Sequence, residues 1–279
     1  METGRASKTA LGVAIRRAAH QLIDDPPVLD DPIAVRLVGN GFPRLMERAI
    51  HPVGRDFRGF MAARSRYAED QLAESVARGV KQYVVLGAGL DTFAYRNRFP
   101  ALRVFEVDFP ATQVWKRSML EDAAIALPPN LVFVALDFEH QTLAEGLAKG
   151  GLEMDEPAFF SWLGVVPYLT LDAFRATLGV VARMPAGSGM SFDYAVAPEM
   201  LSPIGRIAFD RLSERVAAAG EPFRLLFKPD DLEAELRAAG FRRIEQVGSA
   251  QLNDLYFMNR ADGLKLSPLG LGMLVTAWV

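Results

Sequence analysis

The chain has 279 residues, half of them apolar, with no cysteine and a formal net charge of −3 at pH 7. A chain of this size buries enough surface to fold without disulfides or a structural metal. The lack of cysteine excludes thiolate zinc sites and cysteine nucleophiles. The near-neutral charge gives no general attraction to nucleic acid or to anionic lipid, so neither is an expected partner.

The two ends of the chain carry no ordinary targeting or membrane-spanning signal. Residues 9–15 form a short apolar run that is followed by basic residues rather than by a signal-peptide cleavage site. The longest apolar stretch, residues 269–279, falls short of the roughly 20 residues that span a bilayer. We therefore expect a cytoplasmic protein that does not bind a membrane.

The first 80 residues are expected to form a mostly helical N-terminal cap, with a proline-rich break at 24–32 and a long helix over about 55–78. From about residue 82, β-branched and aromatic runs alternate with helical stretches, which predicts an α/β fold with a parallel sheet between helices. The expected parallel strands span residues 83–86, 103–107, 132–136, 159–163 and 190–194. A helix opening at Pro110 and another over 171–184 are two of the connections.

The C-terminal third departs from this alternation. Residues 196–228 interrupt the chain after the fifth strand and contain an amphipathic stretch from Ile204 to Val216, which we expect to form a lid over the strand ends, where such sheets bind ligands. Residues 229–239 predict a helix stopped by Gly240. Residues 242–247 and 271–279 predict two strands that pair antiparallel as a hairpin. Residues 81–279 would then form one core with the lid inserted.

A glycine turn, Gly87-Ala88-Gly89, follows the first predicted strand. Glycine lacks Cβ, so a ligand can lie against the backbone, and a helix starting here would offer free N–H groups to an anion. Thr92 stands where the dinucleotide-binding fingerprint has its third glycine. The turn therefore indicates a nucleotide-type ligand, the alternative being a tight turn with no ligand.

Carboxylates end the next two strands. Asp108 lies 21 residues after Gly87 and can accept hydrogen bonds from both ribose hydroxyls. Asp137 can accept from the exocyclic amine of an adenine whose ring lies against Phe138, although a helix N-cap is an equal alternative for Asp137. Together these positions predict that adenosine binds at the strand ends.

The motifs resemble those of the leucine carboxyl methyltransferase family, in particular its bacterial branch of S-adenosylmethionine-dependent methyltransferases. The matching stretches are TALGVAIRRAAHQLIDDP, LDDPIA, AARSRYAED, VVLGAGLDTFAYR, FEVDFP, FFSWLGVVPYLT, FKPDDLEAELRAAGF and AQLNDLYF, and they cover nearly the whole chain. Five parallel strands followed by an antiparallel pair are also typical of the class I methyltransferase fold. We therefore expect a Rossmann-like, mostly parallel sheet of seven strands with its last strand antiparallel, and S-adenosyl-L-methionine as the cofactor.

The resemblance implies roles for individual residues. Arg64 would pair with the methionine carboxylate of the cofactor, as a bidentate guanidinium can, and Arg66 is the alternative. Lys8 would reach the same carboxylate, unless it is a solvated terminal charge. The other cofactor-binding residues that we expect are Gly87, Ala88, Gly89, Asp108, Phe109, Asp137 and Phe138. Of these, Gly87 and Gly89 would lie under the methionine, Asp108 would hold the ribose, and Asp137 with Phe138 would hold the adenine.

The methyl acceptor is less well indicated. Family members that methylate a protein phosphatase have a glutamate at the position of Leu163, so the resemblance does not imply that substrate. Trp162 and Tyr168 are the candidate catalytic residues that would line the methyl-transfer pocket, whereas core packing for Trp162 and capping of the sheet for Tyr168 are the alternatives. The three histidines are scattered along the chain and predict no metal site.

These observations predict an O-methyltransferase acting on a carboxylate or hydroxyl of a small, largely apolar molecule. A carboxylate is ionised at pH 7 and needs no base, whereas a hydroxyl needs one. The alternatives are an NAD-dependent oxidoreductase, which Thr92 disfavours, and a catalytically silent cofactor-binding protein. The sequence identifies neither the acceptor nor the oligomeric state.

Overall fold

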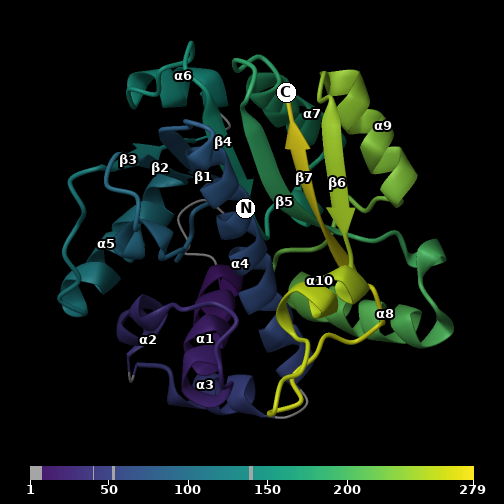
Figure 1. The fold of residues 1–279 in the computed structure, drawn as a ribbon. Coiled ribbons are helices and arrows are strands. Elements are labelled where there is room, and N and C mark those ends of the chain that lie inside the picture. Colours follow the sequence, from purple (N-terminus) through teal and green to yellow (C-terminus); the bar gives the residue numbers. More distant parts are fainter. Residues whose placement is uncertain (1–7, 40, 52–53, 138–140) are drawn as a thin grey trace.

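The computed structural model describes residues 8–39, 41–51, 54–137 and 141–279, and its centre is a seven-stranded sheet of order β3-β2-β1-β4-β5-β7-β6 (Figure 1). The strands are β1 (Gln82–Leu86), β2 (Arg103–Asp108), β3 (Leu131–Ala135), β4 (Ala158–Trp162), β5 (Gly189–Ala195), β6 (Arg243–Val247) and β7 (Gly272–Trp278). Strand β7 is antiparallel to both of its neighbours, and the other strands share one direction. The predicted sheet, mostly parallel with its last strand antiparallel, is confirmed.

Helices cover both faces of the sheet. They are α1 (Lys8–Ile23), α2 (Pro32–Val38), α3 (Pro43–Ile50), α4 (Arg55–Ala77), α5 (Pro110–Asp122), α6 (Leu143–Lys149), α7 (Leu171–Val181), α8 (Pro203–Ala218), α9 (Pro229–Ala239) and α10 (Ser249–Tyr256), with short 3-10 turns η2 (Phe93–Arg96), η3 (Val166–Tyr168) and η4 (Pro198–Met200). Helices α6, α7 and α9 pack on one face, where Phe160 and Phe192 meet Phe174. Helix α4 packs on the other face through Tyr67 and Leu72. Because successive strand residues point to opposite faces and helices cover both faces, these strands are apolar on both sides.

The structure differs from the prediction at the end of one helix and in the connection between the last two strands. The helix expected to reach Met184 ends at Val181. The last two strands do pair antiparallel, but α10 lies between them, so they are not a simple hairpin. Helix α10 has only eight residues, and Leu252 is its one fully buried side chain, so the apolar pattern that could have predicted it is short.

The N-terminal helices do not form one separate layer. Helices α1, α2 and α3 lie together below the sheet in Figure 1, whereas the longer α4 crosses the sheet face and contacts β4 and β5. The division of the chain at residue 80 stays a prediction. Within the described ranges, no helix has both the length and the apolar character needed to cross a membrane.

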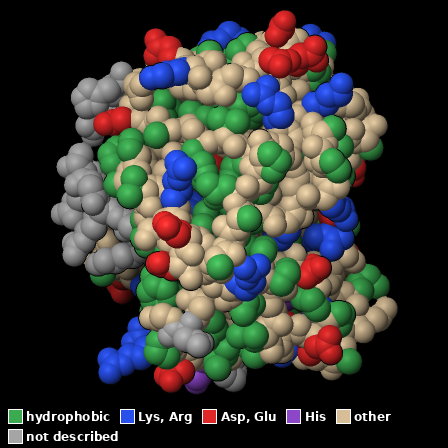
Figure 2. Space-filling view, turned by 90° about the vertical axis from the view of Figure 1, so that its left-hand side faces the viewer, with side chains coloured by type: hydrophobic (Ala, Val, Ile, Leu, Met, Phe, Trp, Pro, Cys, Tyr) green, Lys and Arg blue, Asp and Glu red, His purple; other side chains and the backbone are tan. Residues whose placement is uncertain are grey.

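The insertion after β5 contains η4 and α8 and returns to the sheet at Phe227, which bridges Val196. Helix α8 faces the protein through Gly205 and Phe209, while Ile204 is 70% exposed. The inward stripe therefore does not begin at Ile204, the first residue of the amphipathic stretch. The face in Figure 2 shows acidic and basic side chains interspersed around apolar ones, in keeping with the small net charge.

Candidate functional site

The glycine turn after β1 needs glycine for its backbone conformation. Gly87 and Gly89 have φ of +66° and +46°, in the left-handed region that side chains disfavour. A Cβ on Gly87 would come 2.5 Å from Val165 Cγ2, and one on Gly89 would come 3.1 Å from the Cβ of Ala10. On this side of the turn, the missing side chains therefore admit the protein's own Val165 and Ala10.

The helix expected directly after this turn is not there, because the chain forms only the short η2. The N–H groups of Gly87 and Ala88 donate to Val107 O at 2.9 and 3.1 Å. The prediction that these groups would be free to bind an anion is therefore wrong. The side chain of Asn97, directly after η2, accepts a hydrogen bond from Phe99 N. Phe99 precedes Pro100, and a residue before proline disfavours the helical conformation. A turn so occupied does not provide the pyrophosphate site that NAD would need.

Asp108 ends β2 beside this turn, where the sequence places it. Its Oδ2 accepts from Gly89 N at 2.6 Å, and its Oδ1 accepts from Phe109 N at 2.7 Å. Burial raises the pKa of Asp108, against the lowering effect of these two N–H groups. A carboxylate can accept about four hydrogen bonds, so the oriented Asp108 keeps room for two ribose hydroxyls. Phe109 contributes its backbone N–H to this arrangement.

The adenine-side residues are only partly described. Asp137 follows β3 and its carbonyl accepts from Gln141 N at 2.9 Å. The helix after it, α6, is capped by Thr142, so Asp137 does not cap that helix. Phe138 lies outside the described residues. Lys8 opens α1, but its side chain also lies outside the description.

Arg64 extends from α4 toward the end of β5 and is 6% exposed. Its Nη1 donates to Asp193 Oδ2 at 2.9 Å, and Gly164 N donates to the other oxygen of Asp193 at 2.5 Å. A Cβ on Gly164 would lie 3.1 Å from both terminal nitrogens of Arg64, so the loop after β4 closes directly on the guanidinium. Among the described residues, Arg64 Nε is buried without a partner. An arginine with an unsatisfied donor suits a carboxylate ligand.

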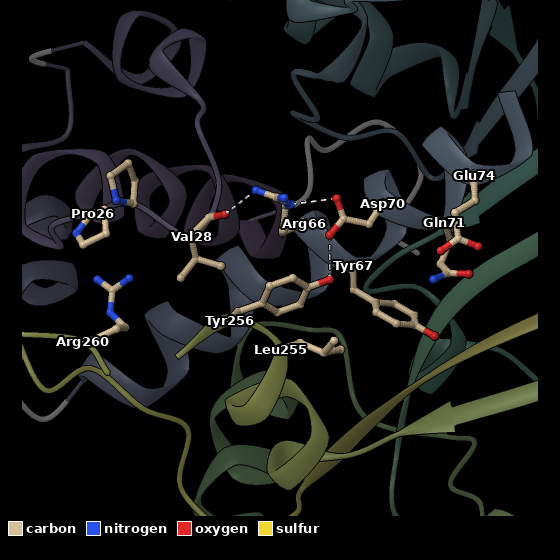
Figure 3. Close-up of a pocket in the computed structure, with 11 residues that line it drawn as sticks. Pro26, Val28, Arg66, Tyr67, Asp70, Gln71, Glu74, Leu255, Tyr256 and Arg260 are labelled. Atoms are coloured by element: carbon tan, nitrogen blue, oxygen red, sulfur yellow. Dashed lines mark hydrogen bonds and ion pairs between the residues drawn. The ribbon is translucent and has the colours of Figure 1, made fainter. Parts of the chain in front are cut away.

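The alternative arginine lies elsewhere. Arg66 is on the outer side of α4, where its Nε donates to Asp70 at 2.8 Å. It lines a groove of about 490 Å³ between residues 26–28, α4 and α10, in which Tyr256 also donates to Asp70 (Figure 3). Of the predicted site residues, only this alternative lines the groove. The groove is therefore not the predicted cofactor site.

The two candidate catalytic residues lie in different surroundings. Trp162 is buried in the core, with its ring stacked on Phe174 at 5.8 Å, as its packing alternative predicted. Tyr168 is half-buried at the end of η3, and its ring lies 5.6 Å from that of Phe223 in the insertion. Burial, and next the charge of Glu221, raise the pKa of Tyr168 to about 12. Tyr168 is therefore protonated at neutral pH.

The strand order brings these groups to one edge. Strands β2, β1, β4 and β5 are consecutive neighbours, and their carboxyl ends carry Asp108, the glycine turn, Gly164 and Asp193 respectively. Val165, next to Gly164, touches Gly87, which ties the arginine region to the turn. The structure thus brings together Arg64, the glycine turn and Asp108, but not Trp162.

Three buried charged residues near this edge were missed by the sequence reasoning. Asp193 stands alone as an acidic residue in the buried strand β5, which is the signal that could have identified it. Glu106 and Lys116 form an ion pair at 2.6 Å with about 1% of each side chain exposed. Burial raises the pKa of Glu106 to about 7. In the part of the chain that the structure describes, no three histidine, aspartate or glutamate side chains are grouped to hold a metal.

Comparison with known proteins places the chain in a family. The leucine carboxyl methyltransferase family model matches residues 10–182. The chain is 32% identical, over 95% of both chains, to the Bacillus subtilis (strain 168) protein YktD, whose name assigns it to the S-adenosyl-L-methionine-dependent methyltransferases. A Mycobacterium avium (strain 104) protein with the same assignment is 33% identical, over 74% of this chain and 72% of its own.

The fold is also similar to solved structures. A Thermobifida fusca YX protein, described as a methyltransferase, superimposes with a TM-score of 0.58 at 19% identity, covering 99% of this chain and 96% of its own. At this identity, the likeness supports the fold alone.

Proposed function

Because this chain belongs to the leucine carboxyl methyltransferase family and is an S-adenosylmethionine-dependent methyltransferase, we propose that it methylates an oxygen of a small, largely apolar molecule. When bound, the cofactor supplies a methyl group already activated on a sulfonium. The protein then has to hold the acceptor oxygen in line with that group and to exclude water.

The proposed cofactor site uses residues that fit its chemistry. Arg64, with its unsatisfied Nε, would hold the methionine carboxylate. Asp108, fixed by two backbone N–H groups, would hold the ribose. Asp137 and Phe138 at the adenine, and Lys8 at the carboxylate, stay predictions from the resemblance.

The observation that carries the acceptor proposal is the contact between the insertion and η3. Arg224 N and Leu225 N donate to Pro167 O at 2.7 and 3.2 Å, and Phe223 packs against Tyr168. Tyr168 lies close enough to Arg64 and Asp193 for their charges to act on its hydroxyl. The insertion thus provides aromatic surface beside the proposed methionine site, which suits an apolar acceptor.

A carboxylate is the acceptor that this arrangement favours. Tyr168 stays protonated at neutral pH, so it can donate a hydrogen bond to the acceptor but cannot serve as the base that a hydroxyl would need. A carboxylate is ionised at pH 7 and requires no base. Hydroxyl methylation is the second candidate, because the resemblance does not distinguish the two.

The test is transfer of a labelled methyl group to paired acids and phenols that share the same apolar body. A methyl ester releases its label as volatile methanol in mild base, whereas an ether does not. We expect base-labile label from the acids. Label only in base-stable product would contradict carboxylate methylation, and no transfer to any member of a broad panel would contradict a small apolar acceptor. The cytoplasmic location stays a prediction from the sequence.

A further inference from the structure

Asp193 is a buried acidic residue on the same strand edge as the proposed cofactor site. It lies in β5 between Phe192 and Tyr194, which both point into the core on the α7 side. Because strand residues alternate in direction, Asp193 points to the opposite face, where α4 presents Arg64. The side chain of Asp193 is only 10% exposed.

The contacts of Asp193 leave part of its carboxylate unused. One oxygen accepts from Arg64 Nη1 at 2.9 Å and the other from Gly164 N at 2.5 Å. A carboxylate has about four acceptor positions, so two remain. A buried carboxylate with spare acceptor positions beside a buried arginine can bind a cation without losing its own partner.

The methionine end of the cofactor carries two opposite charges on one carbon, a carboxylate and an α-ammonium. Arg64 alone would satisfy the carboxylate but would leave the ammonium beside another cation, which is unfavourable in a buried site. Asp193 supplies the opposite charge within hydrogen-bond distance of that guanidinium. The Arg64–Asp193 pair is therefore complementary to the whole zwitterion.

We propose that Asp193 is a cofactor-binding residue. Its carboxylate accepts a hydrogen bond from the α-ammonium of the cofactor, while Arg64 binds the carboxylate on the same carbon of the cofactor. The inference rests on the cofactor site proposed above. Asp108 and Asp193 lie three strand steps apart, roughly 14 Å in a β-sheet. An adenosine extended by an amino-acid side arm then reaches from the ribose carboxylate to this pair.

The experiment compares three ligands by calorimetry on the wild type and on Asp193→Asn. S-adenosylhomocysteine carries both charges, its desamino analogue carries only the carboxylate, and 5′-methylthioadenosine carries neither. We expect the substitution to weaken S-adenosylhomocysteine binding about 10- to 100-fold, which is the range for a lost hydrogen bond to a charged group. Binding of the other two ligands should change less than about threefold. Asp254→Asn on exposed α10 is the matched control.

Each other outcome overturns the proposal. Unchanged or tighter binding of S-adenosylhomocysteine by Asp193→Asn would show that Asp193 is not a ligand, or that it competes with the cofactor for Arg64. An equal loss for all three ligands would assign Asp193 a purely structural role. If the variant does not fold, the wild type still decides, because equal affinity for S-adenosylhomocysteine and its desamino analogue excludes the ammonium contact. A folded wild type that binds none of the three contradicts the cofactor site itself.

Discussion

Replacing Asp108 by alanine tests the ribose contact on which the proposed site depends. The carboxylate accepts from Gly89 N and Phe109 N, and we propose that its remaining acceptor positions bind the ribose. A hydrogen bond to a charged group contributes about 1.5–3 kcal/mol, and about 1.4 kcal/mol corresponds to a tenfold change in affinity. Loss of one or two ribose contacts should therefore weaken cofactor binding by at least tenfold, and by on the order of 100-fold if both contribute.

The asparagine variant sharpens the interpretation. Each carboxylate oxygen of Asp108 accepts one backbone N–H, so an asparagine must turn its own NH₂ group toward Gly89 N or Phe109 N. Two donors then face each other, and we expect Asp108→Asn to lose affinity as well, together with about 1–3 kcal/mol of stability for the unsatisfied N–H.

The assay is calorimetric titration with S-adenosylhomocysteine, combined with urea unfolding of the unliganded variants to separate affinity from stability. Asp122→Ala, at the exposed end of α5, makes the same charge change away from the site. If Asp108→Ala binds within twofold of the wild type, the ribose is held elsewhere and the reasoning fails.

Three further predictions follow from the same edge of the sheet. Gly87→Ala should lower the free energy of unfolding by about 2–4 kcal/mol, because φ is +66° and Val165 Cγ2 would lie 2.5 Å from the new methyl group; urea denaturation measures this, and no recovery on adding Val165→Ala would disprove the clash. Burial raises the pKa of Glu106 from 4.5 to about 7, so the folded state binds the carboxyl proton more tightly than the unfolded state does. The stabilisation that this protonation contributes is complete below pH 4.5 and is lost as the pH rises through 7. As the pH rises from 5 to 8, the free energy of unfolding of Glu106→Gln should increase by about 3 kcal/mol relative to that of the wild type. A difference between the two proteins that does not depend on pH would refute the raised pKa. Tyr168→Phe keeps the ring that packs in the insertion and should slow methyl transfer about tenfold with unchanged cofactor affinity; an unchanged single-turnover rate would show that the hydroxyl does not contact the acceptor.

Local chemistry in the sequence predicted much of the sheet edge that we propose to bind the cofactor. The glycine turn after one strand and Asp108 at the end of the next are patterns of near neighbours along the chain. Because alternating strands and helices form a parallel sheet, the carboxyl ends of these strands lie at one edge. The prediction failed where short-range signals compete. After Gly89 it expected a helix with free N–H groups, but Asn97 and the occupied N–H groups produce a short turn instead.

The sequence by itself determined where the strands lie along the chain, the glycine turn after β1 and the acidic end of β2, because backbone conformation and side-chain alternation depend on near neighbours along the chain. Only the tertiary structure decided that Arg64 meets Asp193, across 129 residues, that Val165 closes on Gly87, and that Trp162 is buried in the core. These contacts join elements distant in sequence, and their geometry follows from how α4 and the loop after β4 pack on the sheet. No local pattern of residues encodes that packing.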